Sequence, residues 1–369
     1  MNITKTNKFL YLVAFVSMAF SGASYASDDL YNEDEDDGNV SAQELSLASL
    51  KGGKIVIANR ASGTLSIISA RSDVVVATVN MPAGVNTPQP MYVVHAAKSD
   101  NVFVGDRGNN RVVVFDDKTF KVKAIIPAGK GVFHMWADPA ETQLWVANDI
   151  DNTATVIDPE TLDVITTIAM PTDIINLGGK PHDVILDTSG DAAFVTFLVN
   201  NNVNDFVVKF DTSTYKELAR AEVGKDPHVS LTRKNKLLYV PTQDNNAVFI
   251  LKRSDLSLVK VLNIPGAHGI AISKSGKTVY TTNISGGGVD GLFSISTKSN
   301  EVIGQAEHTQ FPVPHNIVLN KNSKKLYITH SGATSDQVTV YTLNEKTRLP
   351  TFSKAVSVGN NPFGLTFVK

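Results

Sequence analysis

The stretch from Leu144 to Ile168 reads LWVANDIDNTATVIDPETLDVITTI, and it holds three short runs of apolar and β-branched residues. The runs LWVAN, TATVI and DVITTI are separated by the polar segments DIDN and DPETL. Such runs, bounded by Asn, Asp and Pro, are typical of β-strands joined by tight turns. This stretch therefore predicts three consecutive antiparallel strands, and it has no helical periodicity.

Runs like the first one of this stretch occur seven times along the chain, the quoted copy included. Each copy is followed by a polar turn and two further β-rich runs, and most are preceded by an alternating apolar run such as HGIAIS. Four short strands repeated every 45 residues or so are the pattern of a β-propeller blade, so seven blades are expected. The centres of the seven copies lie 41 to 49 residues apart, at Val56, Phe103, Trp145, Phe194, Tyr239, Tyr280 and Tyr327.

The two ends of the array indicate how the ring closes. The first copy begins at a second strand, KIVIAN from Lys54, and the C-terminal segment NPFGLTFVK from Asn361 supplies a lone first strand. If the last strand completes the first blade, only short strand edges stay exposed. We therefore expect an all-β, seven-bladed β-propeller over residues 52–369, with four-stranded antiparallel blades and the C-terminal strand joining the first blade.

The repeat resembles the YVTN-type propeller repeat. The quoted stretch matches its Y-V-T-N, V-I-D and T…V strands, and YTTN at Tyr280–Asn283 is the closest local match. The resemblance covers about residues 52–369. It implies the propeller fold, and the proteins that share it include surface-layer and secreted binding proteins.

The first 51 residues are expected to lie outside the propeller. Lys5 and Lys8 precede the apolar run FLYLVAFVSMAF and the small residues SGASYA, which is typical of a cleaved Sec-type signal peptide over residues 1–26. Residues 27–51 follow, and eight Asp and Glu without any Lys or Arg up to residue 50 predict an acidic, disordered leader. The signal predicts a periplasmic or secreted protein.

Composition excludes several kinds of chemistry. The chain has no cysteine, which rules out disulfides, thiolate metal sites, iron–sulfur clusters and a cysteine nucleophile. A net charge of −2 and the lack of a basic run argue against nucleic acid as a partner. No later apolar stretch has the length of a transmembrane helix, and no G-x-S-x-G, H-E-x-x-H or P-loop motif occurs. We expect a monomer.

Four histidines share one local frame, at the entry to the first strand of a blade. They occur in KPHDV, DPHVS, GAHGI and VPHNI. Because the first strand of each blade lines the central channel, these side chains should form an arc around one channel mouth. The four residues are His182, His228, His268 and His315.

Three further residues extend this arc less regularly. Met91 takes the same position in an earlier blade, His134 lies one residue past it in the next, and His95 follows Met91 by four residues. Even spacing on a strand would place His95 on the channel face, deeper in the channel. All three are candidate ligand-binding residues.

Imidazole groups converging on one pore suggest a transition-metal site of copper, zinc or iron, with His182, His228, His268 and His315 as ligands. The alternative is that duplication of the repeat left four structural histidines, each hydrogen-bonded within its blade. They would then resemble the histidine of the Gly-His step in WD40 repeats, which is structural. The two interpretations differ in whether the ring nitrogens meet near one point.

The favoured function at this stage is an exported binding protein whose histidine-lined mouth holds a transition metal, a metal complex or a partner protein. One alternative is a metal-dependent enzyme at the same mouth, of lyase or oxidoreductase type. GAHGIAIS resembles blades of streptogramin-type propeller lyases, and a histidine-lined mouth resembles the nitrous oxide reductase propeller. A second alternative is an interaction scaffold with structural histidines, so whether the protein is an enzyme stays open here.

Overall fold

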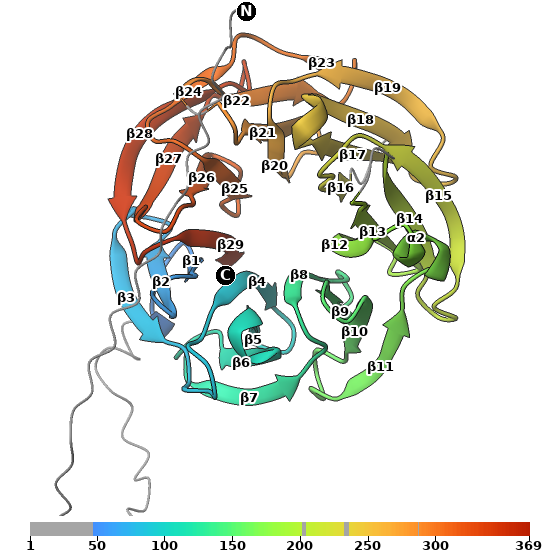
Figure 1. The fold of residues 1–369 in the computed structure, drawn as a ribbon. Helices are drawn as coiled ribbons and strands as arrows, with labels where there is room; N and C mark the ends of the chain where they lie inside the picture. The colour runs from blue at the N-terminus through green and yellow to red at the C-terminus, as the bar shows by residue number, and fades with distance from the viewer. Residues whose placement is uncertain (1–46, 201–203, 232–235, 287) are drawn as a thin grey trace, which may run out of the picture. The chain divides into compact units, whose positions relative to one another are not determined.

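The computed structural model describes residues 47–200, 204–231, 236–286 and 288–369. Seven antiparallel sheets stand around a central channel, each with its first strand innermost (Figure 1). The predicted seven-bladed propeller is confirmed. The signal peptide and most of the acidic leader lie outside the described residues. From Leu47 onward the chain packs on the first two blades, where Leu47 is buried beside Val56 and Val368.

The strands of the blades, from the channel outward, have the following bounds. The closing blade contains β29 (Pro362–Val368), β1 (Lys54–Asn59), β2 (Thr64–Ser69) and β3 (Val75–Asn80). The second contains β4 (Pro90–Ala96), β5 (Asn101–Asp106), β6 (Arg111–Asp116) and β7 (Val122–Pro127). The third contains β8 (Val132–Ala137), β9 (Leu144–Asn148), β10 (Thr153–Ile157) and β11 (Val164–Ala169).

The remaining blades follow the same plan. The fourth contains β12 (Lys180–Leu186), β13 (Ala192–Leu198), β14 (Asp205–Asp211) and β15 (Glu217–Val223). The fifth contains β16 (Ser230–Leu231), β17 (Leu237–Thr242), β18 (Ala247–Lys252) and β19 (Leu258–Asn263). The sixth contains β20 (Ala267–Ile272), β21 (Thr278–Asn283), β22 (Gly288–Ser296) and β23 (Glu301–Val302), and β24 (Glu307–Thr309) pairs with β22. The seventh contains β25 (Pro314–Leu319), β26 (Lys325–His330), β27 (Gln337–Leu343) and β28 (Pro350–Ser357).

Between the described strands, helical structure is confined to short connections. A five-residue helix, α2 (Thr172–Asn176), precedes β12, and two 3₁₀ turns, η1 (Arg107–Asn109) and η2 (Gln243–Asn245), follow second strands. No helix in the described part of the chain is long and apolar enough to cross a membrane.

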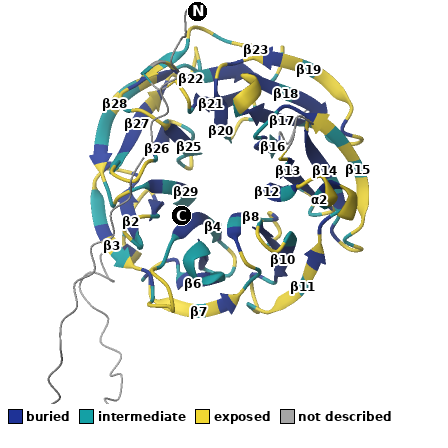
Figure 2. Cartoon of the chain, viewed as in Figure 1, coloured by how far each residue is buried: buried dark blue, intermediate teal, exposed yellow. Residues whose placement is uncertain are grey.

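The ring is closed as predicted, by strands from the two ends of the propeller. β29 pairs antiparallel with β1, and Lys54 lies opposite Val368. The core is formed by the inner and middle strands of neighbouring blades, whereas outer strands such as β7, β11 and β19 are largely exposed (Figure 2). Trp145, Tyr239 and Tyr327, three of the residues that mark the repeat, are fully buried.

A β-bulge recurs near the start of the innermost strands. In β12 the register shifts between Pro181 and Val184, so two residues lie between paired positions. The same shift occurs in β4, β8, β20 and β25. Bulges bend a strand and re-aim its side chains. His182, His268 and His315 lie in such bulges, whereas His228 lies between the paired residues Pro227 and Ser230.

Threonines of the second strands hold three of these bulges. The hydroxyl of Thr282 accepts the backbone N–H of Gly269 at 2.9 Å and donates to the carbonyl of His315 at 3.1 Å. Thr329 connects the bulge of β25 to the carbonyl of Phe363 in the same way, and Thr196 accepts the N–H at the bulge of β12. The repeated threonine therefore fixes the bulge of its own blade. In two blades it also contacts the first strand of the next blade.

Candidate functional site

The four predicted histidines come together in the channel as a continuous row of rings. Ring centroids are 4.7 Å apart for His182 and His228, 3.9 Å for His228 and His268, and 4.8 Å for His268 and His315. All four are buried. Because each side chain leaves the corresponding position at the start of the first strand in successive blades, neighbouring rings touch.

His134 joins this row through a carboxylate that the sequence analysis did not identify. Its Nδ1 lies 2.8 Å from Oδ1 of Asp183, and Oδ2 of Asp183 lies 3.5 Å from Nδ1 of His228. The same carboxylate accepts the backbone N–H groups of Val184 and Val229, at 2.7 and 3.0 Å. Asp183 is thus a buried anion between two imidazoles and two amides.

A second carboxylate, Asp226, lies at the edge of the row. Its Oδ1 is 3.4 Å from Nε2 of His182, and that nitrogen is 3.3 Å from Nε2 of His228. The Asp226 side chain is 24% exposed, whereas the five imidazole residues are 3–8% exposed. Asp226 is therefore the acidic group of the cluster that solvent reaches most easily.

Local geometry fixes the position of Asp226. Its φ of 56° is left-handed, a region that Asp tolerates better than most residues, and Pro227 restricts it further. Its N–H donates to Oδ2 of the buried Asp205 at 2.8 Å. The neighbouring Lys225 contacts the other oxygen of Asp205 at 2.7 Å. Asp205 therefore holds the turn that carries Asp226.

Burial sets the protonation of the cluster. It lowers the pKa of His134, His182, His268 and His315, so these imidazoles are neutral at pH 7. Burial opposes ionisation of Asp183, but His134 and the hydrogen bonds from His134 and His228 hold the pKa of its carboxyl well below the usual range. Burial raises the pKa of Asp226.

Three ring nitrogens of the cluster have no hydrogen-bond partner among the described residues. They are Nε2 of His134 and both nitrogens of His268. Buried polar atoms are nearly always paired, so unpaired atoms at one place point to a ligand or a catalytic role. This observation argues against the structural alternative for these two histidines.

The other side of the channel is aromatic and cationic. The ring of Tyr92 lies 3.7 Å from that of His134, and Phe133 and Phe363 are 6.2 Å apart beside it. The guanidinium groups of Arg60 and Arg107 lie 5.5 Å from the rings of Phe363 and Phe133, respectively. The rings of Tyr92, Phe133 and Phe363 therefore form an aromatic surface beside the histidine row, and two arginines lie against it.

The two arginines differ in their partners. Arg107 forms an ion pair with Asp149 at 2.9 Å, but Arg60 has no acidic partner in the described part of the chain. Burial, together with the nearby charge of Arg107, lowers the pKa of Arg60. A bound anion would offset both effects, so Arg60 is a candidate anion-binding residue.

Two of the predicted residues are placed elsewhere. His95 lies 2.9 Å from Asp117, away from the row, because the bulge between Pro90 and Val93 changes the alternation on which its placement relied. Met91 is fully buried, and Tyr92, one residue later, provides the ring that contacts His134. Sequence analysis missed Tyr92, Asp183 and Asp226, although PHD and DPH already place an acid beside His182 and beside Pro227.

The possible metal-ligand groups also differ from the predicted set. Ligand atoms of His134, His182 and His228 lie within 4.8 Å of one another, and so do those of Asp226, His228 and His268. His182, His228 and His268 of the predicted set are therefore included, but not in one group. His315 belongs to neither group and is flanked by the rings of His268 and Phe363.

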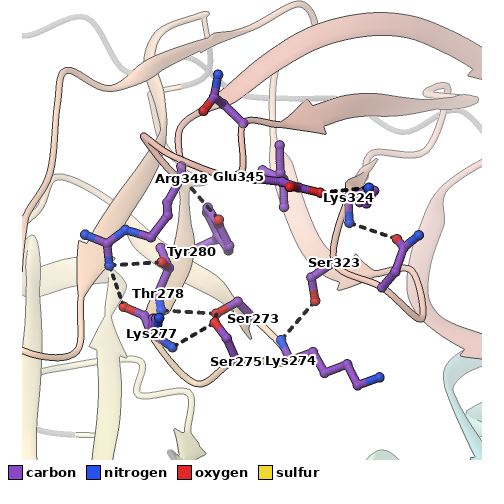
Figure 3. A pocket seen from close by; sticks show the side chains of 13 residues that line it. Ser273, Lys274, Ser275, Lys277, Thr278, Tyr280, Ser323, Lys324, Glu345 and Arg348 are labelled. Carbon is purple, nitrogen blue, oxygen red and sulfur yellow. Dashed lines mark hydrogen bonds and ion pairs between the residues drawn. The ribbon is translucent and has the colours of Figure 1, made fainter.

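A pocket of about 520 Å³ lies at the other end of the same strands (Figure 3). It is lined by the turns that follow β20 and β25, whereas His268 and His315 are near the starts of these strands. Its charged groups are largely engaged, since Lys324 pairs with Glu345 at 2.7 Å and Arg348 donates to the carbonyl of Lys277. It has no part in the histidine cluster.

Comparison with known families bears on what this channel does. The sequence profile of the family described as "Lactonase, 7-bladed beta-propeller" matches residues 1–263. The chain belongs to this lactonase family. No curated protein sequence matches the chain significantly.

Solved structures agree with the family in fold. The periplasmic gluconolactonase PpgL of Pseudomonas aeruginosa has 14% identity and a TM-score of 0.65, covering 86% of this chain and 99% of that one. A Bacteroides uniformis protein described as a candidate 6-phosphogluconolactonase has 16% identity and a TM-score of 0.64, covering 86% and 100%. Hydrazine synthase of Kuenenia stuttgartiensis has 14% identity and a TM-score of 0.60, covering 74% and 88%. At these identities the likeness shows the fold alone.

Membership of the lactonase family corrects the expected function. The prediction of a binding protein is wrong, because the family is one of hydrolytic enzymes. The prediction rested on the arc of histidines, which indicates where a ligand could bind but not whether that ligand is converted. Fold and repeat type do not determine chemistry.

Proposed function

We propose that this lactonase-family protein hydrolyses a lactone at the histidine cluster of its channel. The observation that carries the proposal is the cluster itself, in which Asp226 lies at the exposed edge and neither ring nitrogen of His268 has a partner among the described residues. A hydrolase needs a base for water and a donor for the carbonyl oxygen, and these two residues provide both.

The reaction can be assigned to named groups. The carboxylate of Asp226 takes a proton from water as the water oxygen attacks the lactone carbonyl carbon. A ring N–H of His268 donates to the carbonyl oxygen as it gains negative charge. The C–O bond of the ring then breaks, and Asp226 returns the proton to the leaving oxygen, which gives a hydroxy acid. Lactone and water are the only reactants.

Asp205 has a positioning role in this scheme. It accepts the N–H of Asp226 and holds Lys225, so it fixes the turn without reaching the channel. Charge-assisted contacts of this kind preorganise a catalytic group, and a misplacement of about 1 Å can lower the rate.

The mouth supports an anionic lactone as the substrate. Arg60 lies beside Phe363 and has no acidic partner among the described residues, so it can bind a phosphate or carboxylate while the sugar ring lies on the aromatic surface. PpgL and the Bacteroides protein are named for gluconolactone and 6-phosphogluconolactone. The charge of Arg60 favours the phosphorylated member of this pair.

Two further proposals concern the rest of the chain. The blades are of YVTN type, and the threonines of FVTF, YTTN and YITH that hold the channel bulges support this. The signal-like segment at residues 1–26 supports export to the periplasm or beyond.

The direct test is an assay of the purified protein on glucono-δ-lactone, its 6-phosphate and δ-valerolactone. Ring opening releases one proton at neutral pH, so hydrolysis can be followed with a pH indicator after subtraction of the spontaneous rate. We expect turnover of at least one sugar lactone, fastest with the 6-phosphate. Rates equal to the spontaneous reaction for all three compounds would refute the proposal.

A further inference from the structure

Three imidazoles of the cluster are arranged to receive a cation. Nε2 of His182 and Nε2 of His228 are 3.3 Å apart, and His134 completes a group whose ligand atoms lie within 4.8 Å of one another. An ion bound tetrahedrally at about 2.0–2.1 Å from each nitrogen separates them by roughly 3.3–3.4 Å. The His182–His228 distance already matches this spacing.

Asp183 orients two of these three rings. It lies 2.8 Å from Nδ1 of His134 and 3.5 Å from Nδ1 of His228. Since a carboxylate only accepts hydrogen bonds, both Nδ1 atoms carry the proton, and both Nε2 atoms present a lone pair. Metal-binding histidines nearly always have such a carboxylate or carbonyl partner on the second nitrogen.

The Nε2 atoms have little other use within the protein. Nε2 of His134 is buried without a partner among the described residues, and Nε2 of His228 faces another imidazole nitrogen. Asp226 lies 3.4 Å from Nε2 of His182 on the exposed side. A water or substrate oxygen on the ion would therefore lie next to the proposed base.

We propose that His134, His182 and His228 bind one divalent transition-metal ion of the zinc type through Nε2, with Asp183 as the carboxylate that orients His134 and His228. Three histidines leave a fourth position open, as in catalytic zinc sites. An ion there lowers the pKa of a bound water and makes it a better nucleophile. The proposal goes beyond lactone hydrolysis, because binding can be measured without any substrate.

The test titrates zinc and cobalt(II) into chelator-treated protein. Zinc affinity is measured by competition with a chromophoric chelator, and cobalt(II) reports four-coordinate geometry through its visible absorption. We expect one ion per chain. Each of the substitutions His134→Ala, His182→Ala and His228→Ala should abolish stoichiometric binding, and Asp183→Asn should weaken it about 10- to 100-fold.

Matched controls come from the same ring and from outside it. His268→Ala removes a channel histidine outside the proposed ligands, and His95→Ala removes a histidine that pairs with Asp117. Both should keep one ion per chain. Circular dichroism checks that each variant is folded, and His134→Gln replaces any alanine variant that is not.

Four outcomes would overturn the metal proposal. They are no stoichiometric binding by the wild type, no tetrahedral cobalt spectrum, unchanged binding by the folded His134 variants, and loss of the ion in His268→Ala. The last would assign it to the group of Asp226, His228 and His268. Full lactonase activity in metal-free protein would overturn the ion's catalytic role and leave the proposed function intact. A metal-loaded protein without lactonase activity would refute the proposed function and leave the site.

Discussion

The two sides of the channel carry different chemistry on the same scaffold. The blades of β8, β12, β16, β20 and β25 place histidines at the mouth, whereas those of β29 and β4 place Phe363 and Tyr92. His134 and Phe133, adjacent residues of one bulge, mark the boundary. The repeat therefore places one side chain per blade at the channel mouth. The residue type at that position decides whether the side chain can bind a ligand, take part in a reaction or only pack.

The comparison extends to charge. The histidine side holds two carboxylates and neutral imidazoles, and the aromatic side holds the guanidinium groups of Arg60 and Arg107. An anionic substrate would be attracted to the second side and react at the first. Separate substitutions on the two sides should therefore affect the rate of the chemical step and substrate affinity differently.

The largest effect is expected on the histidine side. Asp226→Asn removes the proposed base, while Asn tolerates the left-handed φ of 56° at this position. We expect kcat for lactone hydrolysis to fall about 10²–10⁴-fold with little change in stability. Steady-state kinetics and thermal unfolding measure the two quantities. The exposed Glu160→Gln is the control, and wild-type kcat in Asp226→Asn would exclude this residue as the base.

The next effect tests the contact between blades on each side. A Cβ at Gly269 would lie 1.9 Å from the carbonyl oxygen of His315, and one at Gly364 would lie 2.4 Å from that of Met91. We expect Gly269→Ala to lower the free energy of unfolding by about 2–3 kcal/mol, and Gly364→Ala by somewhat less. Chemical denaturation checks this, with the exposed Lys346→Ala as a neutral control. Equal stability of Gly269→Ala and wild type would mean that the blades separate easily.

On the aromatic side, Arg60→Gln should affect substrate binding. Losing one charged hydrogen-bond donor to phosphate should raise KM for 6-phosphogluconolactone about 10- to 100-fold. The KM for the uncharged gluconolactone should stay within roughly twofold, because it makes no such contact. Arg71→Gln, an exposed arginine, is the control. An equal rise in KM for both lactones would show that Arg60 does not select the anion.

The last prediction concerns His330, a buried histidine outside the row whose two ring nitrogens both have partners. Nitrogens of His330 contact the carbonyl of Pro312 at 3.0 Å and Thr339 at 2.8 Å, and burial lowers its pKa to about 4. Between pH 6.5 and 4 the unfolded chain is protonated at this histidine and the folded one is not. Stability therefore falls with falling pH, by at most about 1.4 kcal/mol per unit from this group.

The variant that isolates this effect is His330→Asn, the residue found at this position in YTTN. Denaturant unfolding at several pH values should give a shallower loss of stability between pH 6.5 and 4 than in the wild type. An identical slope in the two proteins would assign the whole acid sensitivity to the channel histidines.

Much of the architecture could be predicted from the repeat. Aromatic or apolar centres such as Trp145 and Tyr239 recur because every blade must bury the same surface, and the lone terminal strand indicated closure. The histidine frame likewise predicted that His182, His228, His268 and His315 meet. His95 was misplaced because strand alternation fails across a bulge, which the sequence does not mark.

The sequence by itself determined the number of blades, the closure of the ring and the arc of histidines, since these depend on a period and on a shared position in each repeat. Tertiary structure alone decided that Asp183 lies between His134 and His228, that Asp226 is at the exposed edge, and that Arg60 lies over Phe363. These contacts join different blades over distances of a few ångströms. Such distances depend on how the bulges aim each side chain, and a repeat pattern does not contain that information.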